Sequence, residues 1–341
     1  MSRIREVWAQ TLDREMRMIR DVVEQYPCIA MDTEFPGVVA RPIGTFKTSS
    51  DYHYQTMRCN VDLLKIIQVG ITLADENGQF PEPCCTWQFN FKFSIGDDIY
   101  APESIELLQK SGIDFERHEK YGIQPNDFAE LMITSGLVLT TDTKWISFHS
   151  GYDFGYFVKL LTAESLPTSE DSFFSLLRTW FPTVYDIKFM MRASKVLKGG
   201  LQDVADDLGV VRTGPSHQAG SDSLLTASTF FKMCELYFNN QIDDSEYSGK
   251  LYGLGQTFNL INGYVDPTRG GATIAEKDDR APLRERSQTP GLNGVQAGQG
   301  VGLGMGALQA GALPTPLPSA SFGPMTANGP YLRTSLVGGG R

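Results

Sequence analysis

Hydrophobic and polar positions up to about residue 262 switch repeatedly between the spacing of a helix and that of a strand. Apolar residues between Ile4 and Val23 recur at intervals of three and four, which predicts one amphipathic helix. The apolar run Cys28–Met31, bounded by Pro27 and Pro36, predicts a buried strand. The same reasoning predicts further strands at 63–73, 86–93, 145–148 and 184–187, and helices at 103–110, 126–134, 154–161, 201–208 and 219–238.

A turn sequence, Asp75–Gly78, joins two of these strands into an antiparallel hairpin, which we expect to pair beside the first strand. In the second strand of the hairpin, one face is marked by Trp87, Phe89, Phe91 and Phe93. Strands and helices alternate after it. The pattern therefore predicts an α/β fold, with a mixed sheet flanked by helices on both sides.

The end of the chain has a different composition. Between Gly291 and Arg341 the only charged side chains are Arg333 and Arg341, and small, apolar residues recur without a helical or strand period. The stretch 269–286, which precedes it, is rich in charge. These features predict one folded domain at 1–262 and a disordered region at 263–341, made of a charged linker and a Gly/Pro/Ala-rich tail.

Composition and charge narrow the functional classes. Hydrophobic residues make up 41% of the 341 residues, and the five cysteines lack metal-ligand spacing, which predicts a sizeable core and reduced, structural thiols. No stretch of about 18 consecutive apolar residues occurs, so we expect no membrane association and a location in the cytoplasm or also the nucleus. The net charge of −10 argues against broad, non-specific nucleic-acid binding but allows an enzyme that grips a few nucleotides at a strand end.

Two carboxylates follow the first buried strand. Asp32 and Glu34 are separated by one residue, so in an extended chain their side chains point to the same face. Two like charges brought close together and out of water cost about a few kcal/mol unless a cation neutralises them. The spacing therefore predicts a divalent metal ion at this strand.

Three more polar residues complete a candidate catalytic set. Asp153 lies where a predicted strand ends and a helix begins, and Asp222 lies early in the last predicted helix, with His217 just before it. The four carboxylates can hold two divalent ions, Mg2+ or Mn2+, roughly 3.5 to 4 Å apart, which is the arrangement that cleaves phosphodiesters. His217 is suited to act as the general base that takes the proton of the attacking water.

Each of these residues also has a structural explanation. An Asp-x-Glu pair on a strand is common by chance, and the helix-associated residues Asp153, His217 and Asp222 can serve as caps or complement a helix dipole. Asp186 provides a comparison, because it too follows a strand-like run. We expect it to cap the next helix and to tolerate substitution better than the site residues.

The complete set resembles the DEDDh branch of the ribonuclease-D-like 3′-to-5′ exonucleases, which have a ribonuclease-H-like architecture. Further motifs lie at 31–37, 59–65, 87–91, 147–154 and 197–202, in addition to the one at 217–222. Through these motifs the chain, between about residues 3 and 255, is still more similar to the Caf-type (Pop-type) catalytic subunits of the CCR-NOT deadenylase complex. The resemblance implies a poly(A)-specific exoribonuclease that shortens messenger RNA tails and releases AMP. It also implies a NOT scaffold subunit and a leucine-rich-repeat nuclease as partners.

Contacts to the RNA 3′ end are a separate prediction. Phe35 can stack on a terminal base, and His149 can bond a phosphate or a sugar, although core packing explains either residue. A basic stripe on one predicted helix can guide phosphates or can simply be solvated; it comprises Lys188, Arg192, Lys195 and Lys198. The adenine preference follows from the resemblance alone. An exonuclease for DNA or structured RNA, and a scaffold that has lost catalysis, stay open as alternatives.

Overall fold

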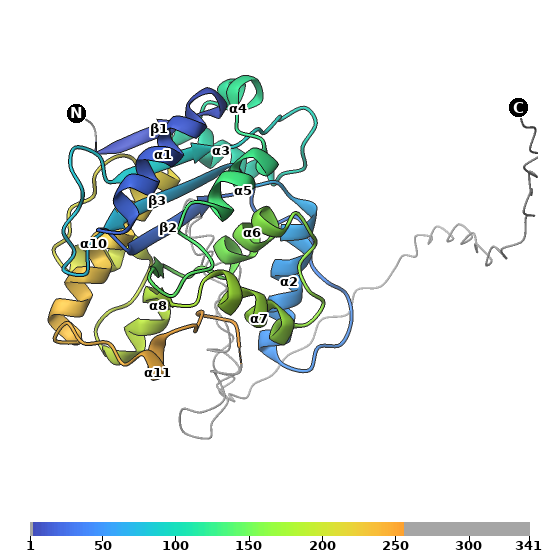
Figure 1. The fold of residues 1–341 in the computed structure, drawn as a ribbon. Coiled ribbons are helices and arrows are strands. Elements are labelled where there is room, and N and C mark those ends of the chain that lie inside the picture. The colour runs from blue at the N-terminus through green and yellow to red at the C-terminus, as the bar shows by residue number, and fades with distance from the viewer. Residues whose placement is uncertain (1–2, 256–341) are drawn as a thin grey trace, which may run out of the picture. The chain divides into compact units, whose positions relative to one another are not determined.

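Six strands form one mixed sheet in the computed structural model, which describes residues 3–255 (Figure 1). The predicted boundary near residue 262 and the predicted tail at 263–341 lie outside the described residues. Along the sheet the strand order is β1-β4-β3-β2-β5-β6. The strands are β1 (Ile4–Val7), β2 (Cys28–Glu34), β3 (Gln68–Ala74), β4 (Thr86–Asn90), β5 (Lys144–Ser147) and β6 (Val184–Asp186).

Strand β2 lies inside the sheet. It pairs antiparallel with β3 on one side and parallel with β5 on the other, and β3 pairs antiparallel with β4. The predicted hairpin, its place beside the first strand and the mixed sheet are therefore confirmed. The outer strands β1 and β6 pair parallel with β4 and β5.

Helices cover both faces of the sheet, as the sequence predicts (Figure 1). One face packs against α1 (Leu12–Val23), α2 (Ser49–Leu63), α5 (Pro125–Ile133), α6 (Gly151–Thr162) and α7 (Glu170–Trp180). The other face packs against α8 (Ile187–Met190), α9 (Leu201–Asp207), α10 (Ala219–Tyr237) and α11 (Asp244–Tyr247). The helices α3 (Pro102–Lys110) and α4 (Phe115–Tyr121) pack in a smaller cluster of their own.

The alternation along β2 divides its side chains between the two cores. Ile29 and Met31 belong to the core under α1 and α6, whereas Cys28 and Ala30 belong to the core under α10. Because strand side chains alternate strictly, the even positions Asp32 and Glu34 continue on the α10 side. Their shared face, which the sequence predicts, is therefore the face that α10 covers.

The predicted N-terminal helix from Ile4 to Val23 is wrong in its first part. Ile4–Val7 is the edge strand β1, paired with β4 in the register Ile4 to Thr86 and Val7 to Phe89. Only Leu12–Val23 forms the helix, after a 3-10 turn at Ala9–Thr11. Hydrogen bonding to the open edge of β4 outweighs the local helical spacing, because strand formation depends on partners distant in sequence.

Four helices of the described region were not expected from the pattern, namely α2, α4, α7 and α11. Helix α2 also moves the start of the next strand from the predicted Leu63 to Gln68. Its inner face is formed by Tyr54, Met57 and Val61, spaced by three and four, and Thr48 caps it by accepting a hydrogen bond from the Asp51 N–H. The helical spacing of these apolar residues is present in the sequence, but the polar and aromatic residues between them make it hard to recognise.

The described helices include none that is both long and apolar enough to cross a membrane. All five cysteines are free thiols, and four of them are buried. Burial raises the pKa of Cys28 to about 11 and that of Cys234 to about 12, which keeps both thiols protonated and inert. The prediction of reduced, structural cysteines agrees with these surroundings.

One buried histidine should make stability depend on pH. His118 of α4 is 1% exposed, and its Nδ1–H donates to the Phe91 carbonyl at 2.7 Å. Burial lowers its pKa from 6.5 to about 4, although this hydrogen bond acts in the opposite direction. Below pH 6.5 the unfolded chain therefore binds a proton that the folded chain does not, so stability present above pH 6.5 is lost as the pH falls towards 4. The expected loss is about 3 kcal/mol of unfolding free energy.

Urea unfolding of the wild type and His118→Gln at pH 7 and pH 4.5 measures this loss. The variant lacks the imidazole, so its unfolding free energy should fall less over the interval, even if it is lower at pH 7. Parallel pH curves for the two proteins would show that His118 is not the group that titrates.

Candidate active site

The carboxylates of β2 lie in the interior of the protein. Asp32 is 8% exposed and Glu34 is 0% exposed. Asp32 is paired with Gly70 of β3 and Glu34 with Gln68, so both acids lie beside polar or small residues rather than the apolar core. A pair of buried acids at one end of a strand needs compensating positive charge when both are ionised.

Helix α10 approaches this end of the sheet very closely, and Gly70 makes the approach possible. A Cβ atom on Gly70 would lie 1.8 Å from the carbonyl oxygen of Ala219, the first residue of α10. A backbone of one element can come this near to another only where the strand has no side chain. The start of α10 therefore lies directly over the neighbour of Asp32.

Asp222, in the first turn of α10, connects the helix to the loop before it. Its Oδ2 accepts the backbone N–H of His217 at 3.0 Å, and its Oδ1 forms an ion pair with Nη1 of Arg212. The side chains of Glu34, His217 and Asp222 each offer a ligand atom, and these three atoms all lie within 4.8 Å of one another. The two ends of the domain thus meet at one cluster.

Asp153 reaches β2 from the other neighbouring strand. It lies in the first turn of α6, directly after β5, where the sequence places it, and it is 1% exposed. Its Oδ1 accepts from both the backbone N–H of Thr33 at 3.1 Å and the Thr33 hydroxyl at 2.5 Å. Asp153 is therefore fixed beside the residue that separates Asp32 from Glu34.

Two histidines near the site have unusual backbones. His149 and His217 have φ angles of +54° and +59°, in the left-handed region that few residues other than glycine adopt. In each case an aspartate accepts the backbone N–H: Asp186 holds His149 at 2.8 Å, and Asp222 holds His217. Strained backbone of this kind persists where surrounding contacts determine it, often at functional sites.

Asp186 has the capping role that the sequence predicts. It is the N-cap of α8, and its carboxylate accepts from the Lys188 N–H as well as those of His149, Ser150 and Tyr252. With four backbone donors and no exposure it is a structural carboxylate. We expect its substitution to lower stability rather than to remove a metal ligand, so these contacts do not support the predicted tolerance of this position to substitution.

The donor set fits hard divalent cations, since carboxylate oxygens are the ligands that Mg2+ and Mn2+ prefer. Of the five predicted site residues, Glu34, His217 and Asp222 form the tight cluster. Asp32 shares the strand face of Glu34, and Asp153 is joined to the strand through Thr33. The cluster contains His217, for which we predicted the role of general base, so its imidazole lies within reach of the carboxylates.

The two aromatic residues that we predicted to contact RNA, Phe35 and His149, have different surroundings. Phe35 is only 6% exposed, and its ring stacks on Tyr152 and Tyr156, with centroid distances of 5.3 and 5.1 Å. Core packing, the alternative left open by the sequence, thus describes Phe35 better than base stacking. His149 is half-buried, with its ring edge-on to Tyr252, and its contact to RNA stays a prediction.

The predicted basic stripe is wrong as a helix face. Helix α8 ends at Met190, a 3-10 turn follows at Met191–Ala193, and the chain then leaves helical geometry. Lys188 points back and donates to the Gly199 carbonyl at 2.5 Å. Lys198 is exposed in the loop, so its contact with RNA stays a prediction without the support of an aligned stripe.

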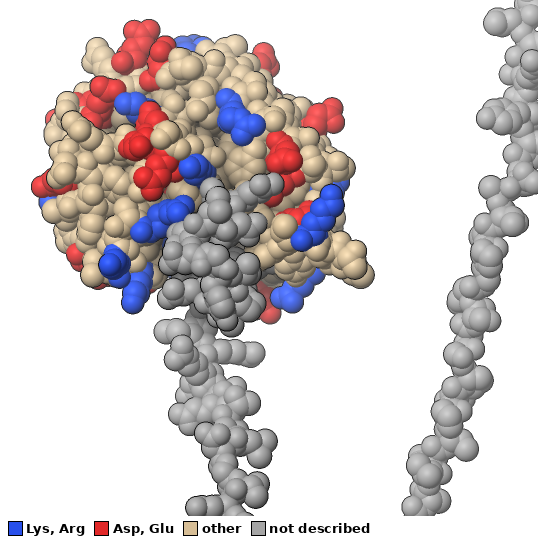
Figure 2. Space-filling view, turned by 90° about the horizontal axis from the view of Figure 1, so that it is seen from below, with Lys and Arg blue, Asp and Glu red and all other residues tan. Residues whose placement is uncertain are grey.

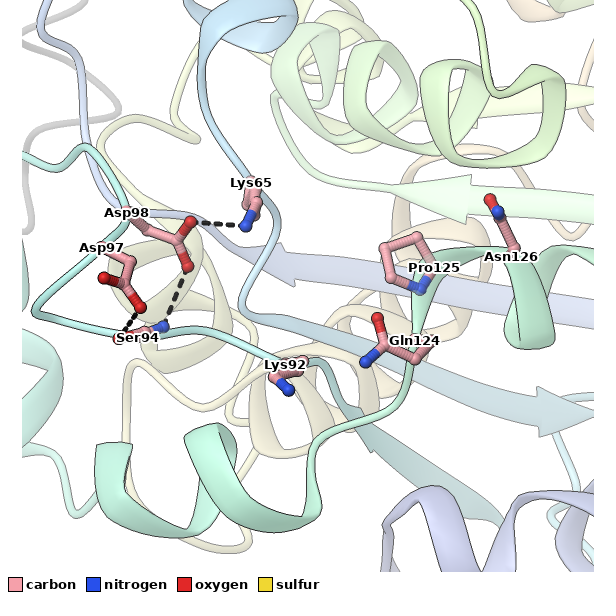
Figure 3. A pocket seen from close by; sticks show the side chains of 8 residues that line it. All are labelled: Lys65, Lys92, Ser94, Asp97, Asp98, Gln124, Pro125 and Asn126. Atoms are coloured by element: carbon pink, nitrogen blue, oxygen red, sulfur yellow. Dashed lines mark hydrogen bonds and ion pairs between the residues drawn. The ribbon is translucent and has the colours of Figure 1, made fainter.

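A separate pocket of about 440 Å3 lies beyond the start of β3 (Figure 3). Its charged groups largely neutralise one another: Lys65 forms an ion pair with Asp98 at 2.5 Å, and Asp98 also accepts the Ser94 N–H. None of the five predicted site residues lines it. The buried carboxylates rather than this hollow define the candidate site.

Sequence reasoning missed three residues that shape the site. Arg212 and Thr33 act through contacts with Asp222 and Asp153, and nothing in their local sequence indicates these partners. Gly70 did have a signal, because a glycine inside a predicted strand often marks a close backbone approach.

Comparison with known proteins places these features in a family. The model of the CAF1 family ribonucleases matches residues 7–131 and 132–230. The poly(A) ribonuclease pop2 of Schizosaccharomyces pombe is 56% identical over 261 residues, which cover 76% of this chain and 78% of that protein.

Solved structures agree. The structure of S. pombe Pop2p in its Mg2+ and Mn2+ bound form is 56% identical, covers 74% of this chain and 100% of its own, and superposes with a TM-score of 0.73. A yeast CAF1 chain co-crystallised with the NOT1 MIF4G domain is 35% identical, with a TM-score of 0.62, covering 73% of this chain and 96% of that one. The α/β, ribonuclease-H-like fold class is confirmed.

Proposed function

Because this chain belongs to the CAF1 family of ribonucleases, we propose that it shortens poly(A) tails from the 3′ end by hydrolysing phosphodiester bonds and releasing AMP. The activity is that of a poly(A)-specific 3′-to-5′ exoribonuclease, a hydrolase. The observation that carries the proposal is the cluster of Glu34, His217 and Asp222, assembled beside Asp32 from opposite ends of the domain.

Divalent metal ions are the proposed cofactors, two of them, as Mg2+ or Mn2+. Asp32, Glu34, Asp153 and Asp222 are the residues that would hold them, and the related Pop2p has been solved with both metals bound. When bound, such ions activate water and offset the charge that develops on the reacting phosphate and the leaving oxygen.

The residues of the chain itself provide orientation and proton transfer. His217 accepts the proton of the attacking water, and its backbone is held in place by Asp222. Arg212 compensates one charge on Asp222, while Thr33 orients Asp153 through two hydrogen bonds. Since these supports are buried or half-buried, the carboxylates are preorganised before substrate arrives.

Poly(A) is the proposed substrate because the S. pombe relative is named a poly(A) ribonuclease. The surface is consistent with a small footprint on the RNA. In the part of the face that Figure 2 leaves uncovered, Lys and Arg side chains are interspersed with Asp and Glu. Affinity then depends on the strand end at the active site rather than on long-range charge.

A NOT scaffold is the proposed partner, supported by the co-crystal of yeast CAF1 with a NOT1 domain. A leucine-rich-repeat nuclease is a second proposed partner, and it rests on the family resemblance alone. The proposed location is the cytoplasm or also the nucleus, where messenger RNA is found and thiols such as these five stay reduced.

An end-labelled RNA with a 3′ oligo(A) tract tests the function. We expect stepwise shortening by the full-length protein in Mg2+ or Mn2+ and none in EDTA. Competitor RNAs ending in oligo(A), oligo(U) or a hairpin, and single-stranded DNA, measure the preference for adenine.

Two outcomes would contradict the proposal. Equal inhibition by DNA and by every RNA would indicate an exonuclease without poly(A) specificity. A folded protein that shortens no substrate with either metal would instead indicate a scaffold that has lost catalysis.

A further inference from the structure

Two rows of mostly polar residues cross the sheet beneath the start of α10. One row runs through directly paired positions on four strands: Glu6, Gln88, Gly70 and Asp32. The second row is formed by Asn90, Gln68 and Glu34. Because residues that pair directly across strands point to the same face, the polar surface continues from the candidate metal ligands to the edge strand β1.

The first turn of α10 is capped by this surface. A helix has backbone N–H groups at its start without partners inside the helix, and a side chain at the N-cap usually satisfies one of them. Here Gln218, the N-cap residue, makes no such bond. Instead, Oε1 of Gln68 accepts the Ala219 N–H at 3.2 Å, and Oε1 of Gln88 accepts the Gly220 N–H at 2.8 Å.

Neighbouring groups fix the two amides with their oxygens towards the helix. Nε2 of Gln68 donates to Asn90 at 2.8 Å, and Nε2 of Gln88 donates to Glu6 at 2.9 Å. Glu6 also accepts from Asn90 at 2.9 Å. A carboxylate only accepts hydrogen bonds, so Glu6 faces the amide nitrogens of Gln88 and Asn90. The Asn90 oxygen then faces the amide nitrogen of Gln68, and the oxygens of Gln68 and Gln88 are left for α10.

We infer that Gln68 and Gln88 are positioning residues for catalysis: by holding the first turn of α10 against the sheet, they set the distance of Asp222 and His217 from Glu34. Ala219 and Gly220 lie within one helical turn of Asp222, so a shift of the capped residues moves the aspartate with them. Both glutamines are 2% exposed; Gln68 is the cross-strand neighbour of Glu34, whereas Gln88 is paired with Gly70. The inference rests on the proposed exonuclease function.

A purely structural role makes a different prediction. If the glutamines only satisfied buried backbone groups, their loss would lower stability, and activity would follow the fraction of folded protein. If they position α10, the folded variant should turn over more slowly, bind metal more weakly and open its first helical turn more often.

Gln88→Leu in the full-length protein separates these roles. We expect kcat on oligo(A) to fall about 30-fold or more with KM changed less than about threefold, since a displacement near 1 Å at a catalytic group can cost about 100-fold. Calorimetric titration with Mn2+ should show weaker binding, and hydrogen exchange should become faster at residues 219–223.

Two further proteins control the experiment. Thr143→Val removes another buried hydrogen bond, to the Leu137 carbonyl, far along the chain from α10, and should lower the melting temperature without changing kcat. The double variant Glu6→Gln with Gln88→Glu exchanges the two side chains. The carboxylate at position 88 again accepts the Gly220 N–H, and the amide at position 6 donates to that carboxylate. The double variant should bring kcat back to within about fivefold of the wild type.

The inference would be overturned if Gln88→Leu slowed turnover no more than Thr143→Val, or if the first turn of α10 exchanged at the wild-type rate. Should Gln88→Leu not fold, Glu6→Ala at the exposed edge gives the same comparison, with a smaller fall in kcat expected. A wild type that shortens no oligo(A) contradicts the proposed function, whereas hydrogen exchange and Mn2+ binding still test the positioning.

Discussion

Replacing Asp32 by Asn, or Glu34 by Gln, is expected to abolish nuclease activity while the protein stays folded. Each substitution keeps the shape of the side chain and removes one negative charge from the buried end of β2. A lost ligand charge at a metal site that stabilises the transition state by several kcal/mol should reduce kcat/KM about 1,000-fold or more. The gel assay with oligo(A) RNA measures this loss directly.

In the absence of metal, the same substitutions should leave the stability of the protein unchanged or raise it. A neutral amide costs less to bury than a second carboxylate, so each variant should melt at the same temperature as the wild type, or higher, in EDTA. Adding Mn2+ should raise the melting temperature of the wild type more than that of the variants, because only the wild type has the full ligand charge.

Asp127→Asn is a suitable control for both measurements. Asp127 is an exposed aspartate in the first turn of α5 and should respond to neither metal nor substrate. If Asp32→Asn retained more than about a tenth of the wild-type activity, Asp32 would not be a ligand whose charge catalysis requires.

Gly70→Ala should also lower activity strongly, although Gly70 has no side chain to take part in chemistry. Its new methyl group would lie 1.8 Å from the Ala219 carbonyl oxygen, and the next atoms it meets also belong to the α10 backbone. Backbone cannot swing aside as a side chain can, so α10 must move away by more than about 1 Å, a shift that can cost about 100-fold in rate. Overpacking should also lower stability by about 1–3 kcal/mol.

Gly96→Ala is the matched control, because a Cβ at Gly96 would meet only Ser94 Oγ at an ordinary 3.7 Å. Single-turnover kinetics and urea unfolding of the two variants separate rate from stability. Wild-type turnover in a folded Gly70→Ala protein would show that the close approach of α10 to β3 does not set the geometry of the site.

Some features of the candidate site can be predicted from the sequence alone, and others cannot. The shared face of Asp32 and Glu34 follows from the alternation of a strand, and the cap formed by Asp186 follows from its place before α8. Both depend on residues that are near neighbours in the chain, so the local pattern was enough.

Contacts between segments far apart in the chain are harder to predict from the sequence. The strand character of Ile4–Val7 appears only when β4 offers its edge, and the expected basic stripe fails because the chain leaves helical geometry after Ala193. In the same way, the sequence allows a nucleic-acid base to stack on Phe35, but in the folded protein Tyr152 and Tyr156 stack on its ring. The spacing of residues within one segment does not show which distant segment packs against it or pairs with it.

The sequence by itself determined the α/β class, the order of the central hairpin, the carboxylates and histidine of the candidate site, and the family that their motifs resemble. Only the tertiary structure decided that Glu34 meets His217 and Asp222, that Arg212 compensates Asp222, and that glutamines of the sheet cap α10. The reason is physical: periodicity and caps act over a few residues, whereas the position of α10 depends on a close backbone approach and on hydrogen bonds between strands and a helix far apart in the chain.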